Sequence, residues 1–161
     1  VPLWHIIHRQ YRDTFARYGN HPAFPVEFFI EAAALLAKQL VVFVAFREET
    51  PVASAICYRD AETLYGRHWG TGIDMPGLHF ELCYYQGIEY CIRHGLQGFE
   101  PGAQGEHKLA RGFEPVATWS AFWIAHPGMR RAVADFVLRE DSAMQDYEAE
   151  TTAHLPFKLA V

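Results

Sequence analysis

Residues 40–69, LVVFVAFREETPVASAICYRDAETLYGRHW, decide the fold. Residues 40–46 are apolar throughout, which predicts a strand that is covered on both faces. A polar turn leads to a second strand at residues 52–59, which is rich in small side chains, and another polar turn leads to a third strand at residues 63–69. Three short strands joined by tight turns predict an antiparallel meander.

Helices are predicted on both sides of this meander. Apolar residues recur every three to four positions in residues 4–18 and 25–39, and again in residues 78–94. A short strand at residues 98–100 follows the third helix. Together these elements predict an α+β fold, with a mixed, mostly antiparallel sheet flanked by helices.

The C-terminal region continues the pattern. Residues 116–125 predict a long apolar strand, and Pro127 opens a last helix. We expect that helix to turn Val133, Phe136 and Met144 inward, together with Val137. A homodimer formed through the strand is a further structural alternative.

Composition bounds the class of protein. The chain has 161 residues, half of them hydrophobic, and a net charge of −5, which predicts one domain and argues against a general DNA binder. No apolar run approaches the roughly 20 residues that a membrane span needs. The three cysteines form no CxxC pair and predict reduced thiols in a cytoplasmic protein. The His, Asp and Glu spacing does not resemble a metal site, so we expect no metal.

One candidate ligand-binding surface is the third strand. Alternation would place Tyr65, Arg67 and Trp69 on one face as the wall of a pocket. Arg67 would there hold an anionic group of a ligand. The equally weighted alternative is a structural salt bridge from Arg67 to Glu81 or Glu100.

A second candidate is the ionisable loop at residues 100–113, EPGAQGEHKLARGF. Its middle predicts a short helical turn that places Lys108 and Arg111 side by side, where they could hold a phosphate or carboxylate. His107 could accept a proton from an amine, with Glu106 orienting it or acting as the base. The alternative is a solvated, charged loop.

The glycine-rich loop at residues 70–77 is a third candidate. Backbone N–H groups at a helix start suit a phosphate, which marks Gly70, Gly72 and Gly77 as cofactor-binding residues. The alternative is an ordinary connection between strand and helix.

Three motifs carry a resemblance to a known family. They are LYGRHWG at 64–70, LHFELCYYQGIE at 78–89, and PGAQGEHK at 101–108 followed by RGFEP at 111–115. In this order they resemble the FemAB-like family of predicted N-acyltransferases, which is linked to peptidoglycan biosynthesis and recognition. The resemblance covers nearly the whole chain and implies the C-terminal half of a longer protein whose N-terminal half is missing here.

The resemblance implies a GNAT-like fold and transfer of an acyl or aminoacyl group to an amine. The donor would be acyl-CoA or aminoacyl-tRNA, with no prosthetic group, and the acceptor a small molecule or a cell-wall precursor. In GNAT enzymes the loop at the position of residues 70–77 binds the pyrophosphate of acyl-CoA. A different class of function, a non-catalytic recognition or scaffold domain, is the alternative.

The complete predicted site combines these candidates. An oxyanion could be held by backbone N–H groups near residues 53–55. The catalytic residues would be His107 and Glu106. The substrate-binding residues would be Arg67, Lys108, Arg111, Tyr65, Trp69, Glu81, Tyr84, Tyr85, Glu100 and Gln104.

Overall fold

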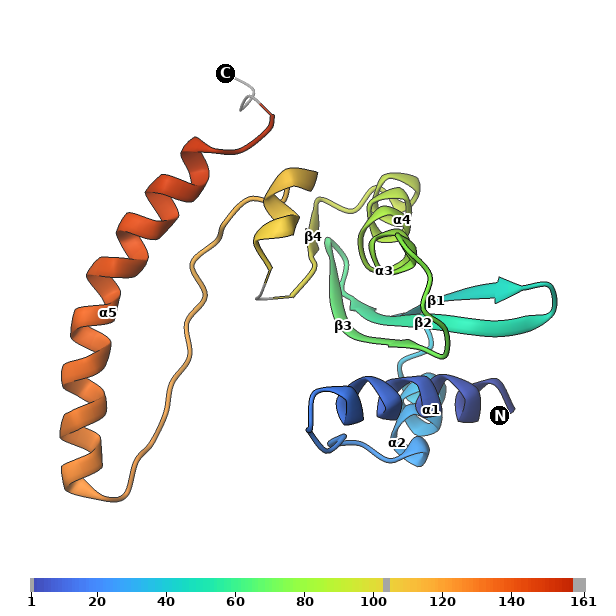
Figure 1. Ribbon diagram of the computed structural model, residues 1–161, viewed down its shortest axis with the longest axis horizontal. Coiled ribbons are helices and arrows are strands. Elements are labelled where there is room, and N and C mark those ends of the chain that lie inside the picture. The colour runs from blue at the N-terminus through green and yellow to red at the C-terminus, as the bar shows by residue number, and fades with distance from the viewer. Residues whose placement is uncertain (1, 103–104, 158–161) are drawn as a thin grey trace. The chain divides into compact units, whose positions relative to one another are not determined.

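The computed structural model describes residues 2–102 and 105–157. The chain divides into two compact units, residues 1–103 and 104–161 (Figure 1). The first unit holds the sheet and the second a short helix and a long one. The organisation as one domain stays a prediction.

The sheet of the first unit has four strands in the order β1-β2-β3-β4. Strands β1 (Leu40–Arg47), β2 (Thr50–Arg59) and β3 (Thr63–Thr71) form the predicted antiparallel meander. Strand β4 (Gly98–Glu100) pairs parallel to β3. The predicted mixed, mostly antiparallel sheet is therefore confirmed.

Two helical layers cover the sheet. Helices α1 (Pro2–Arg17) and α2 (Val26–Leu35) pack on one face. The other face carries one continuous helical segment, made of α3 (Leu78–Phe80), the π-helix η1 (Glu81–Tyr85) and α4 (Gln86–His94). The buried apolar residues between the sheet and these layers are Ile7, Tyr11, Phe29 and Ile56 on the α1 side, and Ala53, Ala55, Cys57, Leu64, Leu82 and Cys91 on the other side.

Strand β1 packs on both faces, as its apolar sequence predicted, but its side chains are only half-buried. Val42 and Val44 contact the α1 side, and Val41 and Phe43 contact the α4 side. The reason is its position at the edge of the sheet, where it pairs with β2 alone among the described strands.

Helix α1 crosses β3 with its backbone in close contact at Gly70. A Cβ atom at this position would lie 2.6 Å from both the carbonyl oxygen of Gln10 and the backbone nitrogen of Tyr11. Backbone atoms of a helix cannot move aside as a flexible side chain can. Only glycine therefore allows the helix to lie this close to the strand.

His68 is built into the aromatic core on the α1 side of the sheet. Its ring meets the edges of Tyr11 and Phe29 at centroid distances of 5.0 and 5.9 Å. Burial, and secondarily the charge of Arg67, lower the pKa of His68 below its ordinary value of 6.5. The core therefore favours the neutral form of the imidazole over the charged one.

The second unit departs from the expected pattern. It begins with the 3-10 helix η2 (Glu106–Arg111), which forms where the short helical turn was predicted and which Gly112 caps in the left-handed conformation. The strand expected at residues 116–125 does not form. Residues 113–124 belong to no helix or strand and pair with none of the described strands. An apolar sequence favours the extended backbone, but a strand exists only when a partner completes its hydrogen bonds.

The last helix, α5 (Pro127–Ala153), was expected to turn apolar residues inward, and this was wrong. Phe136, Val137 and Met144 are 53–54% exposed, and Val133 is 37% exposed. No described helix is both long enough and apolar enough to cross a membrane.

We expect Gly70→Ala to destabilise the first unit by about 1–3 kcal/mol, because the new methyl group forces α1 away from β3. Urea unfolding followed by circular dichroism measures the change. Gly72→Ala is the matched control, since the nearest atom to its Cβ would lie at an ordinary 3.8 Å. Equal stability of the two variants would contradict the role assigned to Gly70.

We expect the folded state to lose stability as the pH falls below about 6.5, because the unfolded chain then binds a proton that buried His68 resists. His68→Phe keeps an aromatic ring in place and should reduce this loss. Melting temperatures at about pH 7.5 and about pH 5 measure it. The exposed His21→Phe should leave the pH dependence unchanged, and an identical effect of both variants would refute the assignment.

Candidate functional site

The first unit contains a cavity of about 340 Å³. It lies where the end of α1, the end of β3, the loop at residues 72–77 and the start of α3 come together. Its lining residues are Thr14, Arg17 and Tyr18 from α1 and the residue after it, Trp69 and Thr71 from β3, Ile73, Asp74 and Met75 from the loop, and Leu78 and His79 from α3.

Thr71 fixes the floor of this cavity and the path of the loop. Its hydroxyl donates to the carbonyl oxygen of Ile73 at 2.7 Å and accepts from the Ile73 N–H at 3.2 Å. The Arg17 guanidinium donates to the carbonyl oxygen of Thr71 at 3.4 Å. These bonds tie the C-terminal end of α1 to the start of the glycine-rich loop.

An aromatic cluster holds the imidazole of His79 at the cavity wall. The ring meets Trp69 edge-on at a centroid distance of 5.2 Å, and Tyr84 at 5.5 Å. Tyr84 is 3% exposed, so this side of the imidazole is anchored in the interior. The π-helix η1 begins two residues after His79, and such π segments occur frequently at functional sites.

The cavity therefore gathers three kinds of polar group against apolar walls. Arg17 supplies a cation, Asp74 a carboxylate and His79 an imidazole. A guanidinium suits a phosphate or carboxylate, a carboxylate suits an ammonium group, and a neutral imidazole accepts a proton near neutral pH. Within one small volume this set suits a ligand that carries both an anion and an amine.

A β-bulge corrects the predicted faces of strand β3. Trp69 pairs with Ala55 and Tyr65 pairs with Tyr58, while Arg67 has no partner on β2, where the register shifts. Ala55 and Tyr58 are three positions apart, so Tyr65 and Trp69 lie on opposite faces of the sheet. Trp69 lines the cavity on the α3 side, and the shared pocket wall of Tyr65, Arg67 and Trp69 was a wrong prediction.

Arg67 forms a salt bridge with Glu100, which was the structural alternative to ligand binding. Its guanidinium donates to the Glu100 carboxylate at 3.2 Å and lies 5.4 Å from the centroid of the Tyr65 ring. The Tyr65 hydroxyl in turn donates to Asp60 at 2.8 Å. The Arg67 and Glu100 side chains are 42% and 47% exposed, so this ion pair contributes little to stability.

The other predicted residues of the first unit fall outside the cavity lining, apart from Trp69. Tyr85 is 48% exposed, and Glu81 accepts a hydrogen bond from Gln86 at 2.8 Å. Gly70 belongs to strand β3 and not to the loop. The backbone of α1 lies against it, at Gln10 and Tyr11. Gly72 and Gly77 lie on the loop, as predicted.

The backbone of residues 53–55 is also committed to the fold. Strand β2 lies between β1 and β3, and Ser54 pairs with both Val44 and Gly70. In a central antiparallel strand the N–H groups belong to the ladder. The expectation that an N–H of this segment holds an oxyanion is therefore wrong.

Most of the ionisable loop, from residue 104 onward, belongs to the second unit. Lys108 and Arg111 share a face of η2, as predicted, because residues i and i+3 lie above one another in a 3-10 helix. The Arg111 guanidinium donates to the carbonyl oxygen of His107 at 2.6 Å, and the His107 side chain is exposed. Gln104 and the side chain of Glu106 lie outside the described part of the chain.

Sequence reasoning missed Arg17, Asp74 and His79 as members of one site. Arg17 lies 54 residues before Thr71, its hydrogen-bond partner, so no local pattern links them. The one available signal was Gly70, whose small size allows α1 to cross the end of β3. Among the described residues no group of three or more His, Cys, Asp or Glu gathers that could hold a metal ion.

Comparison with known proteins places the chain in a family. The FemAB-like family, described as peptidoglycan biosynthesis/recognition, matches residues 2–159. Because this match spans nearly the whole sequence, the chain belongs to the FemAB-like family. No curated protein matches the chain in sequence.

A solved structure of an aminoglycoside N-acetyltransferase, AAC(6')-Iy in complex with CoA, is similar to this chain with a TM-score of 0.48 and 11% identity. The match covers 65% of this chain and 81% of that chain. The predicted fold class, α+β with a mixed, mostly antiparallel sheet between helices, is confirmed by the sheet and its two helical layers.

Proposed function

We propose that this chain is an N-acyltransferase domain that transfers an acyl or aminoacyl group to an amine of a cell-wall precursor. The observation that carries the proposal is the cavity beside Trp69, in which Arg17, Asp74 and His79 converge. Membership in a family described by peptidoglycan biosynthesis/recognition supports the class of acceptor.

The proposed reaction assigns each polar group a role. The carboxylate of Asp74 attracts the ammonium group of the acceptor, and His79 takes the proton that the nitrogen must lose. The nitrogen lone pair then attacks the acyl carbonyl carbon, and the C–S or C–O bond to the donor breaks. The leaving sulfur or oxygen takes the proton back from His79 and departs as a thiol or an alcohol, and the amide nitrogen releases its surplus proton to water. Arg17 pairs with a phosphate or carboxylate of either substrate. Both acyl-CoA thioesters and aminoacyl-tRNA esters are donors of this kind.

His107 and Glu106 remain the second pair of candidates for the base. His107 is exposed on η2, and Lys108 and Arg111 stand on the same short helix. These groups belong to the other unit of the chain, so variants of His79 and His107 separate the two proposals.

A recognition or scaffold domain is the competing function. The pairing of Arg67 with Glu100 favours it, since a predicted ligand-binding cation is occupied within the fold. In that case the same cavity binds a precursor and no transfer follows.

We expect His79→Gln to lower kcat roughly 100-fold or more while the fold is kept, because the amide cannot accept the proton. Arg17→Gln should raise KM more than it lowers kcat. Transfer by the full chain is assayed with a panel of acyl-CoAs and aminoacyl-tRNAs and with amine-bearing UDP-linked peptidoglycan precursors. Arg12→Gln, on the exposed side of α1, is the matched control. Full activity of His79→Gln would exclude His79 as the base.

If His107 is the base, His107→Ala should reduce transfer by a similar factor. We expect no change in the melting temperature in either case, since the side chain is exposed. The same assay, read beside His79→Gln, makes the distinction. If a precursor raises the melting temperature while no donor supports transfer, the recognition function is favoured over the enzyme.

A further inference from the structure

The extended segment before α5 exposes large apolar side chains that are usually buried. Val116, Trp119, Phe122 and Trp123 are 77–89% exposed. The segment belongs to no helix or strand of the described chain and runs as a bare ribbon into α5 (Figure 1). The carbonyl oxygens at its end are bonded to a side chain, since the Arg130 guanidinium donates to that of Ile124 at 2.9 Å and to that of Ala125 at 3.5 Å. Exposed aromatic residues on a backbone that pairs with no described strand are typical of a surface that another strand covers.

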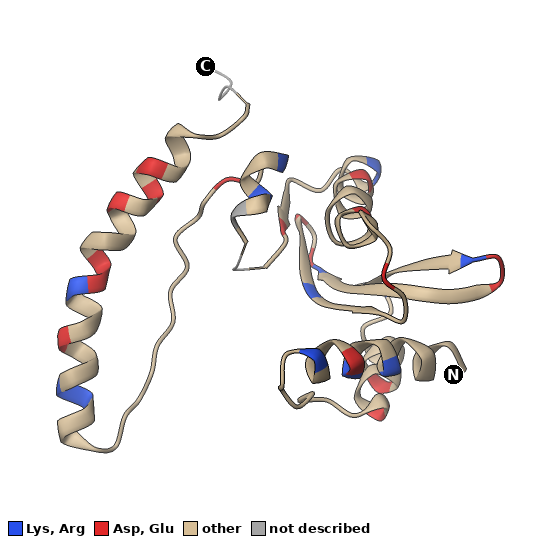
Figure 2. Ribbon diagram, in the orientation of Figure 1, with Lys and Arg blue, Asp and Glu red and all other residues tan. Residues whose placement is uncertain are grey.

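The segment also lacks the features that protect free strand edges. Residues 115–129 contain no Asp, Glu, Lys or Arg, so most of the ribbon between η2 and α5 carries no charged residue (Figure 2). Native proteins commonly place charges on exposed edges to prevent pairing. This segment is therefore suited to pairing with another strand.

We propose that residues 114–126 pair antiparallel with the same residues of a second copy of this chain, with Ser120 opposite Ser120 on the two-fold axis. Such a contact is self-complementary, as a two-fold interface requires. This proposal is independent of the proposed catalytic function.

Side-chain sizes specify this register. On one face each tryptophan lies opposite an alanine, since Trp119 faces Ala121 and Trp123 faces Ala117 of the second copy. Shifting the register by two residues in either direction places Trp119 opposite another tryptophan. Cross-strand pairs of matched size stabilise a sheet. On the other face Val116 would face Ile124, and Thr118 would face Phe122.

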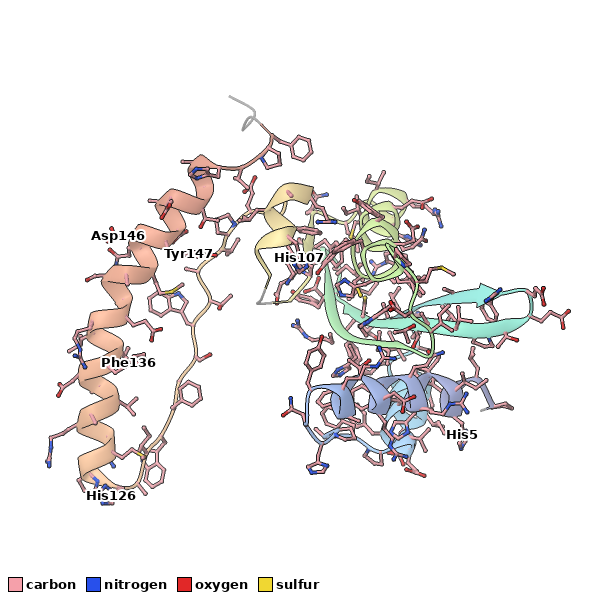
Figure 3. All side chains as sticks on the ribbon, in the orientation of Figure 1. His5, His107, His126, Phe136, Asp146 and Tyr147 are labelled. Atoms are coloured by element: carbon pink, nitrogen blue, oxygen red, sulfur yellow. The ribbon has the colours of Figure 1, made fainter. Side chains whose placement is uncertain are left out.

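A pair of hydrogen-bonding side chains lies at both ends of the same register. Glu114 lies opposite His126, and the two-fold axis repeats this pair at the other end. His126 stands at the start of α5 (Figure 3), where its Nδ1 accepts a hydrogen bond from the Met129 N–H at 3.2 Å. The second ring nitrogen, Nε2, is thus the one that can donate to a carboxylate.

The competing partner is the open edge of β4 within the same chain. That strand has three residues, Gly98–Glu100, and offers pairing for only a fraction of the extended segment. A second copy pairs the whole segment. The length of the available partner therefore favours the dimer.

The test uses two variants that should each form a weak homodimer but should form a stable heterodimer with one another. Ala121→Trp sets tryptophan against tryptophan twice in a homodimer, and Trp119→Ala removes both large side chains. Each should raise the dimer Kd about tenfold or more. In a one-to-one mixture, however, every tryptophan again faces an alanine, so a heterodimer should form with nearly wild-type Kd. Sedimentation equilibrium of the full chain measures these constants.

Ala143→Trp, on the exposed surface of α5, is the control and should leave the Kd unchanged. Ser120→Cys should form an intermolecular disulfide across the axis under mild oxidation, and Thr118→Cys should not. A wild-type chain that stays monomeric at all concentrations would overturn the proposal, as would a mixture no tighter than its single variants. If the wild-type chain is monomeric and Ala121→Trp lowers its stability, the segment pairs with β4 of the same chain instead.

Discussion

The contact between the backbone of α1 and Gly70 is the constraint on which the first unit depends. It lets the buried Gln10 side chain accept a hydrogen bond from Ser54 at 2.8 Å and donate to the carbonyl oxygen of Pro51 at 3.1 Å. A buried amide that satisfies both its oxygen and its nitrogen fixes the helix in one position, because any shift leaves a polar group unpaired. Helix α1 is thus located by a glycine and by a polar pair as well as by apolar packing.

The position of α1 determines the site in turn. Seven residues beyond Gln10, the guanidinium of Arg17 reaches the carbonyl oxygen of Thr71, and the hydroxyl of Thr71 shapes the loop that follows. On the opposite side His79 is fixed by the rings of Trp69 and Tyr84. The cavity is therefore a consequence of core contacts, and Arg17 and His79 are held in position before a ligand arrives.

The sequence allowed the strands, helices and sheet class to be predicted because each follows from local periodicity and turn residues. The site was only partly predictable, because it depends on long-range contacts and on one irregularity. Perfect alternation would have placed Tyr65 beside Trp69, but the bulge at Arg67 separates them onto opposite faces. A one-residue insertion of this kind leaves no signal in hydrophobic periodicity.

The C-terminal segment marks a second limit of local prediction. Its apolar residues predicted a strand, yet the structure forms none there, since strand formation is a property of two segments and not of one. The same sequence failed to predict secondary structure within one chain. It becomes informative when the segment is aligned antiparallel with the same segment of a second copy. Trp119 and Trp123 then fall opposite Ala121 and Ala117, with Glu114 opposite His126. A sequence that does not complete its sheet alone thus specifies, by side-chain size and hydrogen bonding, the register in which a second copy can complete it.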